Sequence, residues 1–233
     1  MLLLTAFAFV VGIGTAAPTL PEHFESDFTE YTAFRSQEAP PPYDNGVPPP
    51  PFKASRGKTF YDWSIKAMIE YRYDFCVNIF EFSNNFPCTF FNINMTTYLI
   101  SNGTTHLPPC CVFGKPWHPP PPNFLSADVN ASFEGRRPWN QEDAWWWIVK
   151  SIAPPTGPFH YSFSAPVGSK PAEVAVYSSF AFPGMSGWVQ QSFFNQRAVK
   201  PPESTWKLPD MCLPIDQLPN CGFFSAKPYR FGH

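Results

Sequence analysis

Six cysteines are the residues of this chain that most directly imply a chemistry, the formation of disulfides. They are Cys76, Cys88, Cys110, Cys111, Cys212 and Cys221. An even number of cysteines is typical of a disulfide framework when a chain is exported to an oxidising compartment. Because Cys110 and Cys111 are adjacent, their side chains would point to opposite faces of a strand, so we expect them to bridge to different partners. Cys212 and Cys221 must then reach back to the middle of the chain and fix the C-terminal segment to the core, while the full pairing stays open.

The sequence lacks the usual motifs of catalysis and metal binding. The segment Gly184-Met185-Ser186-Gly187 resembles the nucleophile elbow of serine hydrolases, but its second glycine comes one residue too early. His118 precedes a proline run, where a solvent-facing loop histidine is the simpler interpretation. No CxxC pair exists and the histidines are scattered, which argues against a zinc site. We therefore expect a protein that is not an enzyme and that uses no metal and no cofactor.

Residues 1–16 have the pattern of a secretory signal peptide. They are short and apolar, and Gly14 and Ala16 supply the small side chains that signal peptidase accepts before a cut. No later stretch is apolar over the roughly 18 to 20 residues that a membrane helix needs. The prediction is a secreted, extracellular chain without an integral membrane segment, and the alternative is a buried helix or strand at the N-terminus.

Three tripeptides close together match the acceptor sequence for N-linked glycans. They begin at Asn94, Asn102 and Asn130. A single match arises easily by chance, whereas the cluster predicts an exposed and glycosylated stretch.

The composition predicts a β-rich fold and argues against a nucleic-acid partner. With 16 basic and 18 acidic residues, the net charge of −2 leaves no basic footprint for nucleic acid. The chain has 30 prolines and an aromatic fraction of 18%, against a charged fraction of only 15%. Prolines break helices and aromatic side chains favour pleated, half-buried surfaces. We expect an all-β fold.

The proline runs at residues 40–42 and 48–51 suggest an extended N-terminal arm. Such runs favour a polyproline II conformation over a packed core. The predicted organisation is a signal peptide over residues 1–16, a proline-rich arm over 17–56, a β domain over 57–222 and a tail over 223–233.

The clearest periodic pattern lies at residues 63–74, where apolar and polar side chains alternate. A period of two predicts a strand with one buried and one solvated face, as in an antiparallel sheet. Further strands are expected at 88–94 and 97–100. A hairpin at Asn102-Gly103 should then lead back to Cys110, and another should pair 159–164 with 173–180.

Residues 139–152 are ambiguous. Pro138, the early acids Glu142 and Asp143, and the late Lys150 indicate a helix. The three consecutive tryptophans at 145–147, followed by Ile148 and Val149, favour a strand, which is our interpretation because the neighbouring segments are β-like.

The order of landmarks over residues 57–213 resembles the ependymin-related protein family, in particular its looser, non-vertebrate-like members. The matching elements are Tyr61-Asp62-Trp63, the strand from Cys88, the hairpin at Asn102-Gly103, the Cys110-Cys111 pair, the prolines at 119–122, Gly135, a tryptophan among 145–147, Ser169-Lys170-Pro171 and Pro209-Asp210-Met211-Cys212. The proline arm, Cys76 and Cys221 depart from the family pattern.

The family resemblance implies a fold and a class of ligand. The implied fold is two stacked, curved antiparallel sheets in a half-barrel, similar to the bacterial lipoprotein carriers, with a deep apolar pocket. It also implies a secreted or lysosomal glycoprotein, often a homodimer, that binds a lipid or another hydrophobic small molecule. Calcium association belongs to the family as well, but no EF-hand loop occurs in this sequence.

Two functional hypotheses follow from the sequence. The first is a non-enzymatic binder of a lipid-like ligand, whose inward side chains come from the alternating strand and the last hairpin. The expected ligand-binding residues are Trp63, Ile65, Ile69, Tyr71, Val174, Val176 and Phe180. The alternative is an extracellular structural, adhesive or carbohydrate-binding glycoprotein, and a deep apolar pocket would favour the first hypothesis over the second.

Overall fold

The computed structural model describes residues 19–34, 52–76, 85–101, 107–123, 132–139, 142–150, 160–166, 177–180 and 187–221. Within these ranges, the regular structure consists of strands and short 3-10 helices. The strands are β1 (His23–Phe34), β2 (Phe52–Asp62), β3 (Ala67–Arg72), β4 (Cys88–Ile93), β5 (Thr96–Ile100), β6 (Cys110–Gly114), β7 (Ser132–Trp139), β8 (Glu142–Lys150), β9 (His160–Pro166), β10 (Tyr177–Phe180) and β11 (Gly187–Arg197). The 3-10 helices are η1 (Trp63–Ile65), η2 (Glu203–Trp206), η3 (Asp210–Cys212) and η4 (Ile215–Gln217). No helix in the described part of the chain is long and apolar enough to cross a membrane.

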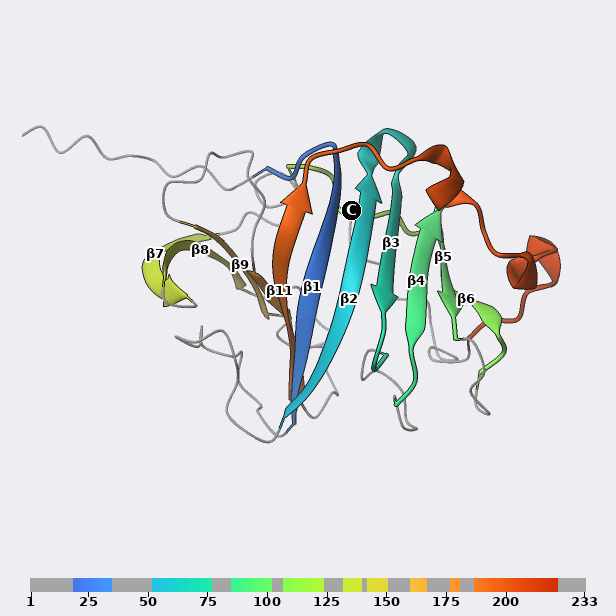
Figure 1. The fold of residues 1–233 in the computed structure, drawn as a ribbon, viewed down its shortest axis with the longest axis horizontal. Helices are drawn as coiled ribbons and strands as arrows, with labels where there is room; N and C mark the ends of the chain where they lie inside the picture. The colour runs from blue at the N-terminus through green and yellow to red at the C-terminus, as the bar shows by residue number, and fades with distance from the viewer. Residues whose placement is uncertain are drawn as a thin grey trace, which may run out of the picture.

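All of these strands form one antiparallel sheet in the order β6-β5-β4-β3-β2-β1-β11-β10-β9-β8-β7. The predicted all-β, disulfide-bonded fold of curved antiparallel sheet is confirmed. The two expected halves are joined by hydrogen bonds, because β1 pairs with β11 from Glu25↔Arg197 to Phe34↔Gly187. Figure 1 shows the resulting half-barrel, in which β7, β8 and β9 turn away from the plane of β1 to β6.

β1 lies in the middle of the sheet, where the sequence predicted an arm outside the core. It pairs with β2 from His23↔Asp62 to Ala33↔Phe52. The predicted arm over residues 17–56 is therefore wrong for β1 and for the first residues of β2, and the β domain begins well before residue 57. The proline runs and residues 1–16 lie outside the described residues.

The burial pattern of β1 lacks the apolar alternation by which a half-buried strand is recognised in a sequence. The buried side chains are Phe24, Ser26, Phe28 and Glu30, so every second buried position is polar. A search for alternating apolar residues does not find such a strand.

The predicted hairpins are confirmed as strand pairs. β4 pairs with β5, and β5 pairs with β6 with Ile100 opposite Cys110. β9 and β10 pair from Tyr161↔Phe180 to Ser164↔Tyr177. The ambiguous segment at 139–152 contains strand β8, which pairs with β7 and β9. Pairing on both sides supplies the tertiary context that outweighs its helix-like charges.

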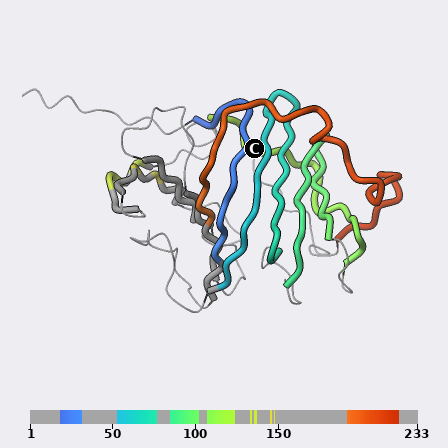
Figure 2. The backbone as a smooth tube through the Cα atoms, viewed as in Figure 1, coloured from blue at the N-terminus to red at the C-terminus, as the bar shows by residue number. Residues whose placement is uncertain are grey.

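The disulfides attach the C-terminal segment to the sheet. They join Cys110 to Cys212, Cys111 to Cys221 and Cys76 to Cys88. The prediction that Cys110 and Cys111 bridge to different partners is confirmed. Figure 2 shows the orange to red segment after β11 running over the upper end of the sheet towards the β6 edge.

The main hydrophobic core lies between β3 to β6 and this C-terminal segment. Its buried members are Ala67, Ile69, Phe91, Tyr98, Ile100, Cys110, Val112, Trp206 and Cys212. The predicted alternation is thus confirmed within β3. Residues 63–65, which were expected to begin the strand, form the 3-10 helix η1 instead. Asp62 caps η1 by accepting from the Ser64 N–H, and Lys66 ends it with a φ of 51°.

Candidate ligand-binding site on the inner face of the sheet

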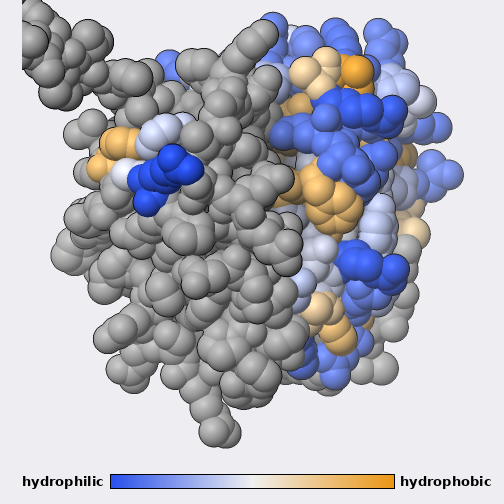
Figure 3. Space-filling model, turned by 60° about the vertical axis from the view of Figure 1, so that its left-hand side comes forward, coloured by the Kyte–Doolittle hydropathy of each residue, from blue (hydrophilic) through white to orange (hydrophobic). Residues whose placement is uncertain are grey.

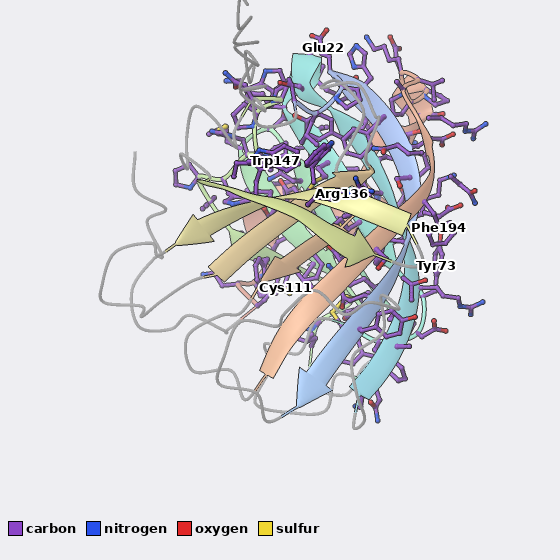
Figure 4. The ribbon with its side chains drawn as sticks, turned by 90° about the vertical axis from the view of Figure 1, so that its left-hand side faces the viewer. Glu22, Tyr73, Cys111, Arg136, Trp147 and Phe194 are labelled. Atoms are coloured by element: carbon purple, nitrogen blue, oxygen red, sulfur yellow. A yellow bond between two sulfur atoms is a disulfide. The ribbon has the colours of Figure 1, made fainter. Side chains whose placement is uncertain are left out.

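The two faces of the sheet differ in what they bury. We call the face that carries the register partners Phe28, Gly57 and Arg72 the inner face, and the opposite one the outer face. In Figure 4, Cys111 and Trp147 lie on the inner side of the curved sheet. The outer face of β1, β2 and β11 is largely hydrophilic, and Figure 3 shows only isolated apolar side chains on the described surface there.

A network of charged and polar side chains lies on the inner face. The Arg72 guanidinium donates from Nη1 to Glu30 Oε2, and from Nη2 to Glu70 Oε2 at 3.2 Å. The Gln191 amide donates to Glu30 Oε2 at 3.2 Å and to Glu70 Oε1 at 3.4 Å. The side chains of Arg72 and Glu30 are each only 2% exposed. β1, β3 and β11, which come from both halves of the sheet, thus meet in one buried network.

Gly57 provides the space that this network needs. It lies in register between Phe28 on β1 and Arg72 on β3. A Cβ at this position would lie 2.1 Å from Cζ of Phe28 and 2.3 Å from the Tyr71 carbonyl oxygen. The Phe28 ring occupies that space, and the Arg72 guanidinium stacks 5.5 Å from its centroid and 5.6 Å from the Phe90 centroid. Any side chain at position 57 would displace the ring that supports Arg72.

Glu70 is the most accessible charged member of the network, with 17% of its side chain exposed. Burial nevertheless raises the pKa of Glu70 from 4.5 to about 7, and the hydrogen bond from Gln191 acts in the opposite direction. Burial also lowers the pKa of Arg72 from 12.5 to about 9, which leaves the guanidinium charged at neutral pH. Glu70 is thus a largely buried carboxyl that keeps a small accessible surface.

The raised pKa of Glu70 makes stability depend on pH. Between its unfolded value of 4.5 and about 7, the folded state binds more protons at this group than the unfolded state. The contribution of Glu70 to the free energy of unfolding should therefore be complete below pH 4.5 and should be lost as the pH rises through about 7. Glu70→Gln should remove this loss, which we expect to be about 2 to 3 kcal/mol. Urea unfolding of both proteins across this pH range measures the difference.

Glu203→Gln is the control for this measurement, because Glu203 is exposed on η2. It should keep the pH dependence of the wild-type protein. Parallel curves for wild type and Glu70→Gln would show that Glu70 titrates as it does in the unfolded chain.

Several buried polar atoms on the inner face have no hydrogen-bond partner among the described residues. They are Thr59 Oγ1, Arg72 Nε, Asn92 Oδ1 and Trp147 Nε1. The orientation of the Asn92 amide is set by its Nδ2, which donates to Thr97 Oγ1 and to the Trp117 carbonyl, each at 3.0 Å. A buried polar atom without a partner costs about 1 to 3 kcal/mol. The inner face therefore holds buried donors and acceptors that no described residue satisfies.

The predicted ligand-binding residues do not come together in one pocket. Ile69 belongs to the core under the C-terminal segment, and Tyr71 packs against that core. Ile65 is 43% exposed on η1, and Trp63 on the same helix contacts the His118 ring edge-on at 5.6 Å between centroids. The expectation that these side chains line one cavity is wrong, because the apolar face of β3 is covered by the C-terminal segment and its polar face turns inward.

The remaining predicted positions are only partly described. Phe180 lies in β10 opposite Tyr161 and Val189, and the placement of its side chain, of Val174 and of Val176 lies outside the described residues. Glu70 and Arg72 are polar members of the alternation at residues 63–74, on the side that was expected to be solvated, and Glu30 and Gln191 were not among the predicted site residues. The only feature of the sequence that pointed to these residues is Gly57, because a glycine inside a strand often marks the close approach of another group.

Of the predicted glycosylation sites, Asn94 is described. It is exposed and forms, with Met95, the turn between β4 and β5, with φ values of 50° and 59°. Positive φ at both turn residues is the tight hairpin geometry that favours asparagine. Asn102 and Asn130 lie outside the described residues.

One cluster resembles a catalytic triad in composition. His23 Nδ1 and Ser64 Oγ both contact Asp62 Oδ1, at 3.0 and 2.6 Å. A nucleophile must instead hydrogen-bond to its base, so this arrangement does not activate Ser64. In the described ranges, no group of three or more His, Cys, Asp or Glu side chains is placed to hold a metal ion.

A surface cavity of about 620 Å³ lies away from the network, between β6 and the C-terminal segment. Its lining includes Val112, Lys115, Leu213, Ile215 and Asp216. It is open to solvent and contains none of the predicted site residues.

No protein-family model matches the sequence. No curated protein sequence matches it either. Among solved structures, an uncharacterized conserved protein from Thermus thermophilus has a TM-score of 0.46 and 7% identity over 82% of this chain and 87% of its own. LprF from Mycobacterium bovis has a TM-score of 0.41 and 12% identity over 77% and 88%. A LolA superfamily protein from Nitrosomonas europaea has a TM-score of 0.37 and 6% identity over 81% and 91%. At these values the chain resembles them only in the general course of its backbone, and a ligand is decided by side chains.

Proposed function

We propose that this chain is a secreted, non-enzymatic glycoprotein that binds a lipid-like ligand against the inner face of its half-barrel, as the resemblance to the ependymin-related family implies. The observation that carries this proposal is the mixed burial of the inner face. Met68, Glu70 and Phe90 keep accessible surface there, while Thr59 and Arg72 beside them are buried. Accessible side chains among buried neighbours are what the wall of a ligand site provides.

The accessible side chains divide into an apolar and a polar part. Phe90 stacks edge-on with Phe113 at 5.1 Å between centroids, and both are partly buried beside the core of Leu99 and Cys111. Phe90 lies opposite Glu70 in the register of β3 and β4. A ligand with an apolar chain and one polar end could contact both parts at once.

The covalent features support an exported protein. All six cysteines form disulfides, and such a density is typical of proteins that fold in an oxidising compartment. The exposed Asn94 turn offers an accessible acceptor for an N-linked glycan.

The alternative function is an extracellular carbohydrate-binding or adhesive glycoprotein. It is favoured by the number of polar side chains on the inner face, since Ser26, Ser55, Thr59 and Asn92 are all buried there. Sugars use hydrogen bonds and aromatic faces but bring no apolar chain, so an uncharged apolar probe separates the two functions.

The test uses diphenylhexatriene, an uncharged apolar dye that fluoresces when it leaves water. The purified full chain should bind one dye per protein at micromolar concentrations, and native mass spectrometry of the protein as purified should show a bound lipid. Met68→Lys, which places a charge on the inner face, should lower dye affinity at least about tenfold. Ile65→Lys is the matched control, because Ile65 is exposed on η1, and it should bind as the wild-type protein does. No dye uptake and no co-purified lipid would contradict the proposal.

A further inference from the structure

We infer that the polar end of the ligand is an uncharged, hydroxyl-bearing head group, such as that of a fatty alcohol or monoacylglycerol, which contacts Glu70 on the inner face. This inference rests on the proposed function, because it names the class of ligand for the same site. It depends on the charges of the network and on the hydrogen-bonding groups that the network leaves unused.

A carboxylate head group is disfavoured by the charges around Glu70. The network contains two acids, Glu30 and Glu70, and one base, Arg72. Arg72 already donates to both acids. A fatty acid would bring a third carboxylate next to Glu70, where the described network contains no cation besides Arg72, and like charges held in contact away from water repel each other strongly.

A cationic head group meets the opposite difficulty. The Arg72 guanidinium lies 3.2 Å from Glu70 Oε2, so an ammonium that approached Glu70 would also approach a buried positive charge. An ammonium group offers no hydrogen-bond acceptor, so nothing in it compensates the repulsion by the Arg72 guanidinium.

A hydroxyl avoids both repulsions and can use the acceptor positions that Glu70 leaves open. It donates and accepts at the same time. The Glu70 carboxylate has about four acceptor positions, of which the described contacts with Arg72 and Gln191 use one on each oxygen. Since the pKa of Glu70 is about 7, its carboxyl can accept from a hydroxyl when ionised and donate to it when protonated.

The experiment compares three ligands with the same fourteen-carbon chain by displacement of diphenylhexatriene at about pH 8, where Glu70 is mostly ionised. The ligands are 1-monomyristin, myristate and tetradecyltrimethylammonium. Monomyristin should bind at least about tenfold more tightly than either charged ligand. Tighter or equal binding of myristate or of the ammonium compound would overturn the inference while leaving the proposed function intact. Failure of all three to displace a bound dye would overturn it too, whereas failure of the dye to bind would contradict the proposed function itself.

Two variants assign the selectivity to Glu70. Glu70→Gln removes the charge at nearly constant size, so the preference for monomyristin over myristate should shrink to about threefold or less while monomyristin affinity changes little. Glu203→Gln removes the same unit of charge at an exposed position on η2 and should keep the full preference. If Glu70→Gln kept the full preference for monomyristin over myristate, Glu70 would not be a contact of the head group.

Discussion

Replacing Arg72 by methionine should lower the free energy of unfolding by about 3 to 5 kcal/mol. The side chains of Arg72 and Glu30 are almost fully buried, and Arg72 is the only cation that contacts Glu30 among the described residues. Without it, the Glu30 carboxylate either stays buried without a counter-charge or must take up a proton. Urea unfolding at neutral pH measures the loss.

Two comparisons separate the buried pair from a general effect of losing an arginine. Arg56→Met removes a guanidinium that is 74% exposed and paired with Asp74 on the protein surface, so it should leave the free energy of unfolding close to that of the wild-type protein. The double variant Arg72→Met with Glu30→Met should recover much of the stability, because apolar residues can replace a buried ion pair. Equal effects of the two single arginine variants would contradict the network.

Replacing Cys110 and Cys212 by serine should cost about 2 to 5 kcal/mol. This disulfide closes a loop with a sequence separation of 102 residues, whereas Cys76–Cys88 closes one of only 12. In the chain-entropy account, loops of these sizes correspond to about 5 and about 3 kcal/mol, so removal of Cys110–Cys212 should be the more harmful. Affinity for diphenylhexatriene should fall as well, since the C-terminal segment covers the outer face of the strands that carry Met68 and Phe90 on the inner face.

Unfolding under oxidising conditions and dye titration measure these two effects, with the Cys76→Ser, Cys88→Ser double variant as control. Peptide mapping without reduction tests the premise. A Cys110–Cys111 link or free thiols in the wild-type protein would contradict it.

The parts of the fold that were predictable from the sequence follow local rules. The alternation around Ile69, the turn chemistry between β5 and β6, and the adjacency of Cys110 and Cys111 each depend on neighbouring residues, and the structure confirms the elements they predicted. The face of β3 that is covered is determined by the C-terminal segment, which lies more than a hundred residues later in the chain. A pattern of neighbouring residues in β3 therefore cannot predict which face is buried.

The candidate site was missed for the same reason. Glu70 and Arg72 look like solvated residues when only their own strand is considered. Arg72 is buried and Glu70 keeps only 17% of its side chain exposed, because β11 brings Gln191 beside them and β1 contributes Glu30 across the space left by Gly57. Buried polar residues that satisfy one another across distant strands resemble surface residues in sequence.

The parallel bridge between Val112 and Asn220 has a consequence for self-association. β6 is an outer strand of the sheet, and an outer strand with free N–H and C=O groups is a template to which another chain can add. Here the Val112 N–H donates to the Pro219 carbonyl at 2.8 Å, and the Val112 carbonyl accepts from the Cys221 N–H at 2.9 Å. Because the Cys111–Cys221 disulfide holds this segment in place, it also keeps the edge of the sheet blocked against aggregation, and a reducing environment would weaken that protection.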